Sequence, residues 1–428
     1  MRFLLYLCNR LFGFVTECSV TIIMVIIQEK NTKERILKAA FSFYTEPRFT
    51  NIPLSGIAER AGITKAAIFR HFKSKEELFD AMRSRYFDDI RDLVPAAAVP
   101  YSDLLERIVE LIQEHEEYLF YTLYQYISDS CFEAVMFLEL EKRGVDLQSY
   151  GICSGVSEDK THIVIRDVEK YYRLLYEIAT TVFFLSSRKR RPCTSNICSD
   201  SGFTASLDAV FEQGISSSAR WLSEKRKREL DSQCIINAED MPEVNPFFDA
   251  LSAVIDKKGF PGTTIESIAD ELGLAKSSLY TYFKNKDELI VTLVEKELLY
   301  LADVVIRKSN NINTSDERGY VTMRTMLNYY LLRPSIVSVT AWLRMRGSFM
   351  FDSMLDKMDV DIAELAKPKE TVTGFPLSRQ QFYGWLHILV TTIFCQSHIN
   401  GLSIDDCMNT IGTYYRYIQQ GVYKDETI

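Results

Sequence analysis

Apolar residues recur every three or four positions along most of the chain, the spacing that predicts helices with one buried face. From Thr32 onward, the apolar positions 36, 37, 40, 41 and 44 share such a face, and positions 104–112 repeat the pattern. The same spacing predicts helices at about 246–257, 378–398 and 403–420. The pattern therefore favours an all-α fold.

One part of this pattern occurs twice. Leu54–Phe79 reads LSGIAERAGITKAAIFRHFKSKEELF, and Ile265–Ile290 reads IESIADELGLAKSSLYTYFKNKDELI. Aligned without gaps at an offset of 211 residues, nine of 26 positions are identical. Solenoid repeats have periods of about 20–50 residues. An offset of about half the chain indicates a tandem duplication of one whole module.

Each copy predicts two short helices joined by a glycine turn. Gly62 and Gly273 suit a left-handed turn, and Thr64 is a good N-cap for a helix over Lys65–His71. The second copy predicts the matching helix over Lys276–Tyr282. Two such helices form a helix-turn-helix, whose second helix enters the DNA major groove. A plain helical hairpin in an all-α core would give the same pattern, so both interpretations stay open on this pattern alone.

The residues around the turn resemble the DNA-binding domain of tetracycline-repressor (TetR) family transcription regulators. The resemblance rests on IAxxxGITKxxIFxHFKSKEEL in the first copy and IAxxLGLAKSSLYTYFKNKDEL in the second. It covers about 60 residues per copy, roughly 32–92 and 245–305. It implies a three-helix domain with the helix-turn-helix in helices two and three. It also implies a helical C-terminal domain that holds a small ligand and makes a four-helix dimer contact.

The resemblance also implies which residues face DNA. In the first copy these are Thr64, Lys65, Ala66, Ala67, Phe69, Arg70, His71 and Lys75. In the second copy they are Thr264, Ala275, Lys276, Ser277, Ser278, Tyr280, Tyr282 and Lys286. The first copy departs from the family twice. Phe69 lacks the hydroxyl of the usual tyrosine, and Pro53 replaces the threonine that Thr264 retains, so two phosphate contacts are in doubt there.

Charge separates the two copies. The whole chain carries a formal charge of −8, which argues against general polyanion binding but permits a local basic patch. Between positions 54 and 75, five Lys and Arg stand against one acid, a net +4; between 265 and 286, three Lys stand against three acids, a net zero. Phosphate neutralisation supplies much of DNA affinity. We therefore expect the first copy to bind more tightly, and the second to add specificity or to be partly degenerate.

The repeat divides the chain into five predicted parts: an apolar extension (1–30), a first helix-turn-helix domain (31–92), a first regulatory domain (93–243), a second helix-turn-helix domain (244–305) and a second regulatory domain (306–428). Helices over about 166–187 and 203–228 would pair with those over 378–398 and 403–420. That pairing would make one chain an intramolecular pseudo-dimer on an imperfect palindromic operator. A dimer of chains with four DNA-reading domains is the alternative.

The first regulatory domain contains an aromatic cluster. It is interpreted either as ordinary core packing or as a pocket for a small apolar effector, lined by Tyr121, Tyr124, Phe132 and Phe137. Positions 144–160 predict a loop, and the basic run Arg188–Arg191 predicts a solvated one. Cys193 and Cys198 lack zinc-ligand spacing. The alternative function is a sensor or protein-interaction module whose second helix-turn-helix no longer binds DNA.

The first 30 residues leave three interpretations open. Residues 3–27 are strongly apolar but contain Arg10 and Glu17 and lack a signal-peptide cleavage site. They are an upstream extension with Met24 as the working start, a membrane anchor, or a structured or swapped apolar segment. Scattered cysteines and the overall composition favour a cytoplasmic protein and make membrane association an unfavoured option.

No catalytic chemistry is predicted. The five histidines form no HExxH or other metal spacing, and no P-loop, GxGxxG or GxSxG motif occurs. We therefore expect no enzyme activity, no metal and no cofactor, with double-stranded DNA and an unidentified small effector as partners.

Overall fold

A computed structural model describes residues 31–45, 52–97, 101–128, 132–156, 163–190, 200–215, 222–243, 245–259, 262–334, 336–337, 379–400 and 402–422. The chain separates into two compact units, one ending at Asp89 and the other beginning at Ile90. The apolar N-terminal segment and the cysteines at 193 and 198 lie outside the described residues.

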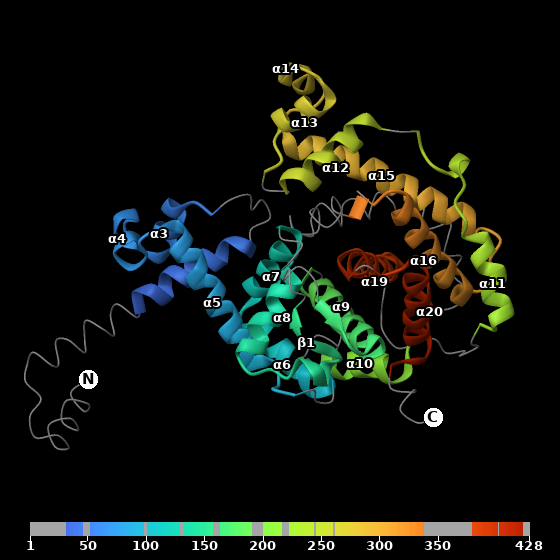
Figure 1. The fold of residues 1–428 in the computed structure, drawn as a ribbon, viewed down its shortest axis with the longest axis horizontal. Helices are drawn as coiled ribbons and strands as arrows, with labels where there is room; N and C mark the ends of the chain where they lie inside the picture. The colour runs from blue at the N-terminus through green and yellow to red at the C-terminus, as the bar shows by residue number, and fades with distance from the viewer. Residues whose placement is uncertain are drawn as a thin grey trace, which may run out of the picture. The chain divides into compact units, whose positions relative to one another are not determined.

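The predicted all-α fold is confirmed (Figure 1). After a helix over 31–41, the helices of the first half are α3 (Leu54–Ala61), α4 (Lys65–His71), α5 (Lys75–Leu93), α6 (Tyr101–Glu114), α7 (Glu116–Ser128), α8 (Phe132–Lys142), α9 (Val168–Arg190) and α10 (Asp200–Gln213). The second half contains α12 (Pro246–Lys258), α13 (Ile265–Leu272), α14 (Lys276–Tyr280), α15 (Lys286–Ser309), α16 (Ser315–Leu332), α19 (Arg379–Asn400) and α20 (Ile404–Gln420). A linker helix, α11 (Glu224–Gln233), precedes them.

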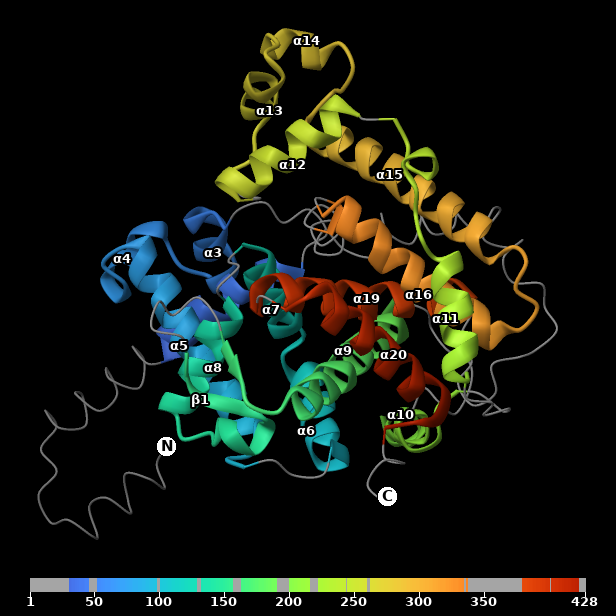
Figure 2. The same ribbon diagram turned by 45° about the vertical axis from the view of Figure 1, so that its right-hand side comes forward.

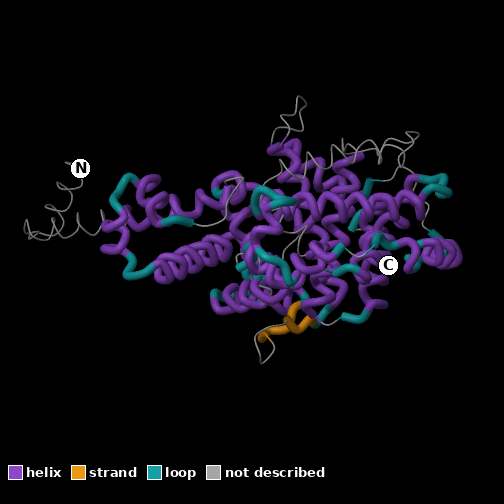
Figure 3. The backbone as a smooth tube through the Cα atoms, turned by 90° about the horizontal axis from the view of Figure 1, so that it is seen from above, coloured by secondary structure: helices purple, strands orange, loops and turns teal. Residues whose placement is uncertain are grey.

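One antiparallel hairpin interrupts the helices of the first half (Figure 3). Strand β1 (Ile152–Val156) pairs with β2 (Ile163–Ile165), with Ile152 opposite Ile165. The predicted loop at 144–160 therefore contains a strand and a short 3-10 helix, Leu147–Tyr150. Gly151, with φ +82°, makes the turn between these two elements. Ile152 is fully buried, and its burial stabilises the strand where a Gly- and Ser-rich composition predicted a loop.

The helix predicted over 203–228 is wrong as a single element. Helix α10 ends at Gln213, because Gly214 adopts a left-handed φ of +73°. Helix α11 begins at Glu224, and its N-cap Ser223 accepts a hydrogen bond from the Arg226 N–H at 3.2 Å. The basic run was also placed wrongly: residues 188–190 continue α9 instead of forming a loop, and Arg191 lies outside the described residues.

The last two helices of each half pack against each other. Helix α9 contacts α19, and α10 contacts α20, within the second compact unit (Figure 2). Two buried polar contacts join α9 to α19. Trp385 Nε1 donates to Thr180 Oγ1 at 3.1 Å, and the Tyr171 hydroxyl lies 2.7 Å from Gln396 Oε1. Trp385 is the largest side chain that is fully buried in this contact.

The ends of α10 and α20 make a reciprocal pair of backbone hydrogen bonds. The Ile215 N–H donates to the Ile418 carbonyl at 2.8 Å, and the Val422 N–H donates to the Phe211 carbonyl at 2.6 Å. The two donors are 207 residues apart in sequence, and so are the two acceptors. The contact is therefore two-fold symmetric at the level of the backbone, as in an interface between identical subunits.

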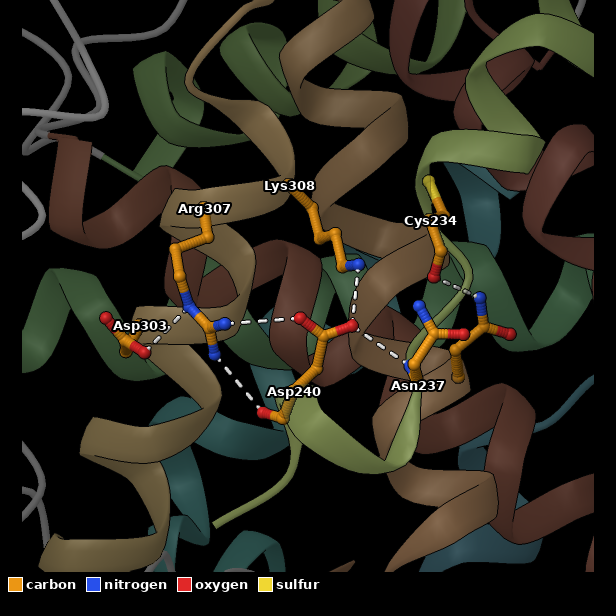
Figure 4. Close-up of polar contacts among 7 residues, drawn as sticks. Cys234, Asn237, Asp240, Asp303, Arg307 and Lys308 are labelled. Carbon is orange, nitrogen blue, oxygen red and sulfur yellow. Dashed lines mark hydrogen bonds and ion pairs between the residues drawn. The ribbon is translucent and has the colours of Figure 1, made fainter.

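The chain between the halves is fixed to the second half (Figure 4). The Asp240 carboxylate binds Lys308 at 2.8 Å and Arg307 at 3.2 Å, both at the end of α15. The hydrogen bonds from Lys308 and from the Asn237 N–H, with the charge of Arg307, lower the pKa of Asp240. Asn328 Nδ2 donates to the Cys234 carbonyl at 2.7 Å. Arg226 of α11 makes two hydrogen bonds to Glu317, at 2.7 and 2.9 Å. The linker is thus a packed element.

Candidate DNA-binding surfaces

The first helix-turn-helix is α3, the turn at Gly62, and α4. Gly62 has a φ of +64°, and its N–H donates to the Glu59 carbonyl at 3.0 Å. Thr64 Oγ1 accepts from the Ala67 N–H at 3.2 Å, which confirms the predicted N-cap. Ile68 is 1% exposed while Phe69 is 45% exposed, so α4 buries one face and presents the other to solvent.

The structure leaves the predicted first recognition residues accessible. Thr64, Lys65, Ala66, Phe69 and Arg70 are exposed, and Ala67, His71 and Lys75 are half-buried. Small and polar side chains at the start of α4 suit close approach to base edges. These residues are therefore open to solvent on one side of α4.

Two arginines hold the first helix-turn-helix onto the segment before it, which consists of the helix over 31–41 and the 3-10 helix Ser42–Thr45. Arg35 donates to the Ala61 carbonyl at the end of α3. Arg60 stacks over the Phe43 ring at 3.6 Å and donates to Ser42 Oγ at 2.8 Å. In the sequence Arg60 is one of the five positive charges of the first copy. Its stacking on Phe43 shows that it also supports the position of α3.

The second helix-turn-helix repeats this geometry with a better-capped start. Gly273 has a φ of +66°, and Thr264 and Ser267 form a reciprocal capping box at the start of α13. The recognition helix α14 ends at Tyr280 and is shorter than predicted. Its neighbouring aromatic residues remain accessible, with Tyr280 48% and Tyr282 68% exposed. Thr264, Ala275, Lys276 and Ser277 are exposed as well, and Ser278 and Lys286 are half-buried.

The cations of the second copy contact groups within their own domain. Lys276 forms an ion pair with Glu266, which lies in the first turn of α13. Lys286 donates to the Thr263 carbonyl. Lys257 pairs with Glu271 at 2.8 Å. At the positions of Glu266 and Glu271 the first copy has Ser55 and Arg60. The charge difference seen in sequence therefore lies partly beside the recognition helix, at Glu266, and partly against α12, at Glu271.

The Lys-x-Lys-acid-Glu-Leu run that both copies share has a structural reason. Ser74 Oγ accepts from the Glu77 N–H at 3.2 Å, while Glu77 accepts from the Lys73 N–H at 2.6 Å. In the second copy Asn285 Oδ1 accepts from the Glu288 N–H at 2.9 Å, and Glu288 accepts from the Lys284 N–H at 2.7 Å. In each run the cap and the glutamate together satisfy two backbone N–H groups at the start of the long helix after the recognition helix, an arrangement related to the capping box.

Comparison with known proteins agrees with this geometry. The family model described as "Bacterial regulatory proteins, tetR family" matches at residues 36–82 and again at 247–293. Both helix-turn-helix domains belong to the tetR family. The chain carries two copies of this DNA-binding module, as the internal repeat predicted.

Similar proteins are named as transcription regulators. The "HTH-type transcriptional repressor SCO4008" of Streptomyces coelicolor is 30% identical over 95 residues, which is 22% of this chain and 46% of that protein. The "HTH-type transcriptional regulator NfxB" of Pseudomonas aeruginosa is 29% identical over 121 residues, 27% of this chain and 59% of that protein. The chain thus spans about half the length of these curated relatives.

Among solved structures, the fatty acid degradation regulator FadR of Bacillus halodurans is similar, with a TM-score of 0.35 and 17% identity. The alignment covers 43% of this chain and 97% of that one. Among the described residues, no helix combines the length and apolar character needed to cross a bilayer. Nor do three His, Cys, Asp or Glu side chains gather as metal ligands in that part of the chain.

The aromatic residues predicted to line an effector pocket lie on α7 and α8. Tyr121, Phe132 and Phe137 are buried and Tyr124 is half-buried, so burial alone fits core packing as well as a pocket. Sequence reasoning missed the polar residues beside them. Glu133 of α8 is buried, and its Oε1 lies 2.7 Å from the Tyr171 hydroxyl, which also contacts Gln396.

Burial raises the pKa of Glu133, and hydrogen bonds from Tyr171 and Gln396 only partly oppose this effect. Among the described residues Glu133 Oε2 has no hydrogen-bond partner. The Tyr171 hydroxyl has one proton for two acceptors, Glu133 Oε1 and Gln396 Oε1, so protonation of Glu133 would supply a second donor to this group. The signal available in sequence was a glutamate between aromatic residues at the start of a helix.

We predict a pH-dependent stability from Glu133. Because its folded pKa is raised, the folded state binds the extra proton, and stability falls as pH rises above the usual carboxyl range. Glu133→Gln is uncharged at every pH and should lose less stability between pH 5 and pH 8. The difference in midpoint should be about 2–4 °C, as expected for about 1 kcal/mol in a domain of this size. Thermal unfolding at both pH values checks this; parallel pH profiles would contradict it.

Proposed function

We propose that this protein is a DNA-binding transcription regulator in which the two halves form an intramolecular pseudo-dimer on an imperfect palindromic operator. The observation that carries the proposal is the presence of two exposed tetR-family recognition surfaces in one chain. The relatives that share the module are named as transcription regulators, which supports the same class. Because one relative is named a repressor, repression is the proposed mode.

The pseudo-dimer is supported by the contact between the last helices of each half. The reciprocal hydrogen bonds of Ile215 and Val422 and the buried Trp385–Thr180 contact are the kind of interaction that two family subunits would share. Covalent linkage raises the effective concentration of one half near the other. An imperfect operator follows because the two recognition segments differ, with Ala66 and Ala67 in one and Ser277 and Ser278 in the other.

An effector is proposed to act from the first regulatory domain, with Tyr121, Tyr124, Phe132 and Phe137 as its lining. A ligand that binds one arrangement of the halves better than another shifts the population toward it and lowers operator affinity by linkage. The effector is an apolar or aromatic small molecule, since aromatic rings dominate this part of α7 and α8. Tyr121→Ala should weaken the response to such a compound without changing DNA affinity in its absence.

A second candidate function follows from the cation contacts of the second copy. Lys276 pairs with Glu266 and Lys286 binds a backbone carbonyl, so both are engaged within the domain. The chain would then be a sensor or interaction protein that reads DNA through its first copy alone. The two functions differ in whether the second recognition helix contributes to operator affinity.

Paired substitutions separate these functions. Operators are selected from random DNA with the full chain, and affinity is then measured for Lys65→Ala with Arg70→Ala and for Lys276→Ala with Tyr280→Phe. The first pair should weaken binding by about tenfold to a hundredfold and reduce the salt slope by about two, since each lost phosphate contact removes about one. A pseudo-dimer on DNA requires the second pair to weaken binding as well. Unchanged affinity for the second pair would establish the alternative.

A further inference from the structure

The internal repeat extends into the helices where the two halves meet. Tyr171–Ser186 of α9 aligns without gaps with Phe382–Ser397 of α19 at the same offset of 211, with six of 16 positions identical. The equivalence assigns each interface residue a counterpart in the other half. The side chains of these counterparts therefore decide whether either half could pair with a second copy of the same half.

The largest buried side chain of the interface has a small counterpart. Trp385 fills the space against α9, with its ring 5.3 Å from Phe184 and its Nε1 bonded to Thr180. Its counterpart in α9 is Leu174. Two first halves would bring two leucines to these positions and leave cavities, and two second halves would bring two tryptophans and overpack them. Only a first half with a second half combines one Trp and one Leu.

The buried polar contact between Tyr171 and Gln396 likewise has no equivalent at the counterpart positions. Tyr171 contacts Gln396 at 2.7 Å, and the counterparts of these residues are Phe382 and Leu185. Gln396 is 5% exposed. In a pair of second halves it would face Phe382, which has no hydrogen-bonding group. A buried amide without a partner is strongly unfavourable, so this position also disfavours pairing of like halves.

From these counterparts we infer that the α19–α20 surface of the second half is shaped to receive the α9–α10 surface of a first half and to reject a second copy of itself. The inference rests on the pseudo-dimer of the proposed function and adds the choice of partner. The backbone contact at Ile215 and Val422 is symmetric and holds any such pair, while the side chains of Trp385 and Gln396 make the contact selective.

Exchanging Trp385 and Leu174 in the full chain tests whether the sizes of these two side chains select the partner. Trp385→Leu alone should lower the thermal midpoint by about 5–10 °C by opening a cavity, and Leu174→Trp alone should lower it by overpacking. The double variant places one Trp and one Leu at counterpart positions, opposite Thr391 instead of Thr180. It should therefore lose clearly less than the sum of the two single variants. A loss equal to or larger than that sum overturns the inference.

Engineered cysteine pairs test the choice of partner. Ile215→Cys with Ile418→Cys should form an oxidised product of one-chain mass. Phe211→Cys with Ile215→Cys is the matched control, because two first halves would bring these positions together across two chains. The parent chain, oxidised in parallel, measures the background of its native cysteines.

The inference predicts no two-chain product for the Phe211–Ile215 control. A two-chain product there overturns it, whether or not the chain binds DNA. A two-chain product for the Ile215–Ile418 pair has a different meaning: first and second halves still select each other, but between chains. That result overturns the intramolecular pseudo-dimer while supporting the selectivity.

Discussion

Gly214→Ala and Gly421→Ala should each lower the free energy of unfolding by about 2–5 kcal/mol. Both glycines have left-handed φ values, +73° and +85°. A residue with a side chain adopts this conformation at a cost of about 1–2 kcal/mol. A Cβ at Gly214 would also lie 2.5 Å from the Gln419 carbonyl carbon, and one at Gly421 would lie 2.6 Å from that of Glu212. Overpacking of this kind adds about 1–3 kcal/mol. Chemical denaturation of the full chain measures the loss.

Gly144→Ala is the matched control for these two variants. Gly144 has a φ of +88°, but no atom lies within 4 Å of an added Cβ. It should show the backbone cost alone, about 1–2 kcal/mol. If the variants at Gly214 and Gly421 lose no more free energy of unfolding than the variant at Gly144, the close approach of α10 and α20 does not limit stability. A larger loss at both, with similar size, would reflect the reciprocal geometry of the contact.

Glu266→Ser combined with Glu271→Arg should raise DNA affinity by about tenfold or more at low salt and steepen the salt dependence. The two changes restore the residues of the first copy and change the local charge by +3. They also release Lys276 and Lys257 from their ion pairs. Each additional phosphate contact adds about 0.9 to the slope of log affinity against log salt. Titrations of operator DNA at several salt concentrations measure both quantities.

Glu239→Ser with Glu243→Arg controls for the change in total charge. Both residues are exposed in the linker outside the second helix-turn-helix, and the substitution changes the net charge by the same amount. A smaller effect of this control locates the gain in affinity at the second helix-turn-helix domain. An equal effect of the two variants would indicate a non-specific response to total charge, and the second copy would then have no demonstrated role at the DNA.

The helix-turn-helix domains could be predicted closely from sequence because their determinants are local. Gly62 and Thr64 specify the turn and the cap by backbone geometry and short-range hydrogen bonds, and α4 begins and ends where predicted. The helix over 203–228 failed because residue composition does not reveal that Gly214 packs against the backbone of α20. That contact depends on residues more than 200 positions away.

The interface between the halves was the least predictable part. The repeat identifies Trp385 as the counterpart of Leu174, but it does not state which residues of α9 and α19 face each other. The pairing of Trp385 with Thr180 required coordinates. Likewise, the sequence gives the net charge around Lys276, whereas only the structure shows its carboxylate partner to be Glu266.

Covalent fusion changes how such an interface can evolve. In a homodimer every substitution occurs twice and must be compatible with its own copy across the axis. Here a substitution at Trp385 occurs once, opposite a different side chain. A single substitution in the other half can therefore compensate for it. The inexact repeat around the buried Tyr171 and Gln396 is the outcome that such relaxed symmetry permits, and the two DNA-reading surfaces are free to diverge in the same way.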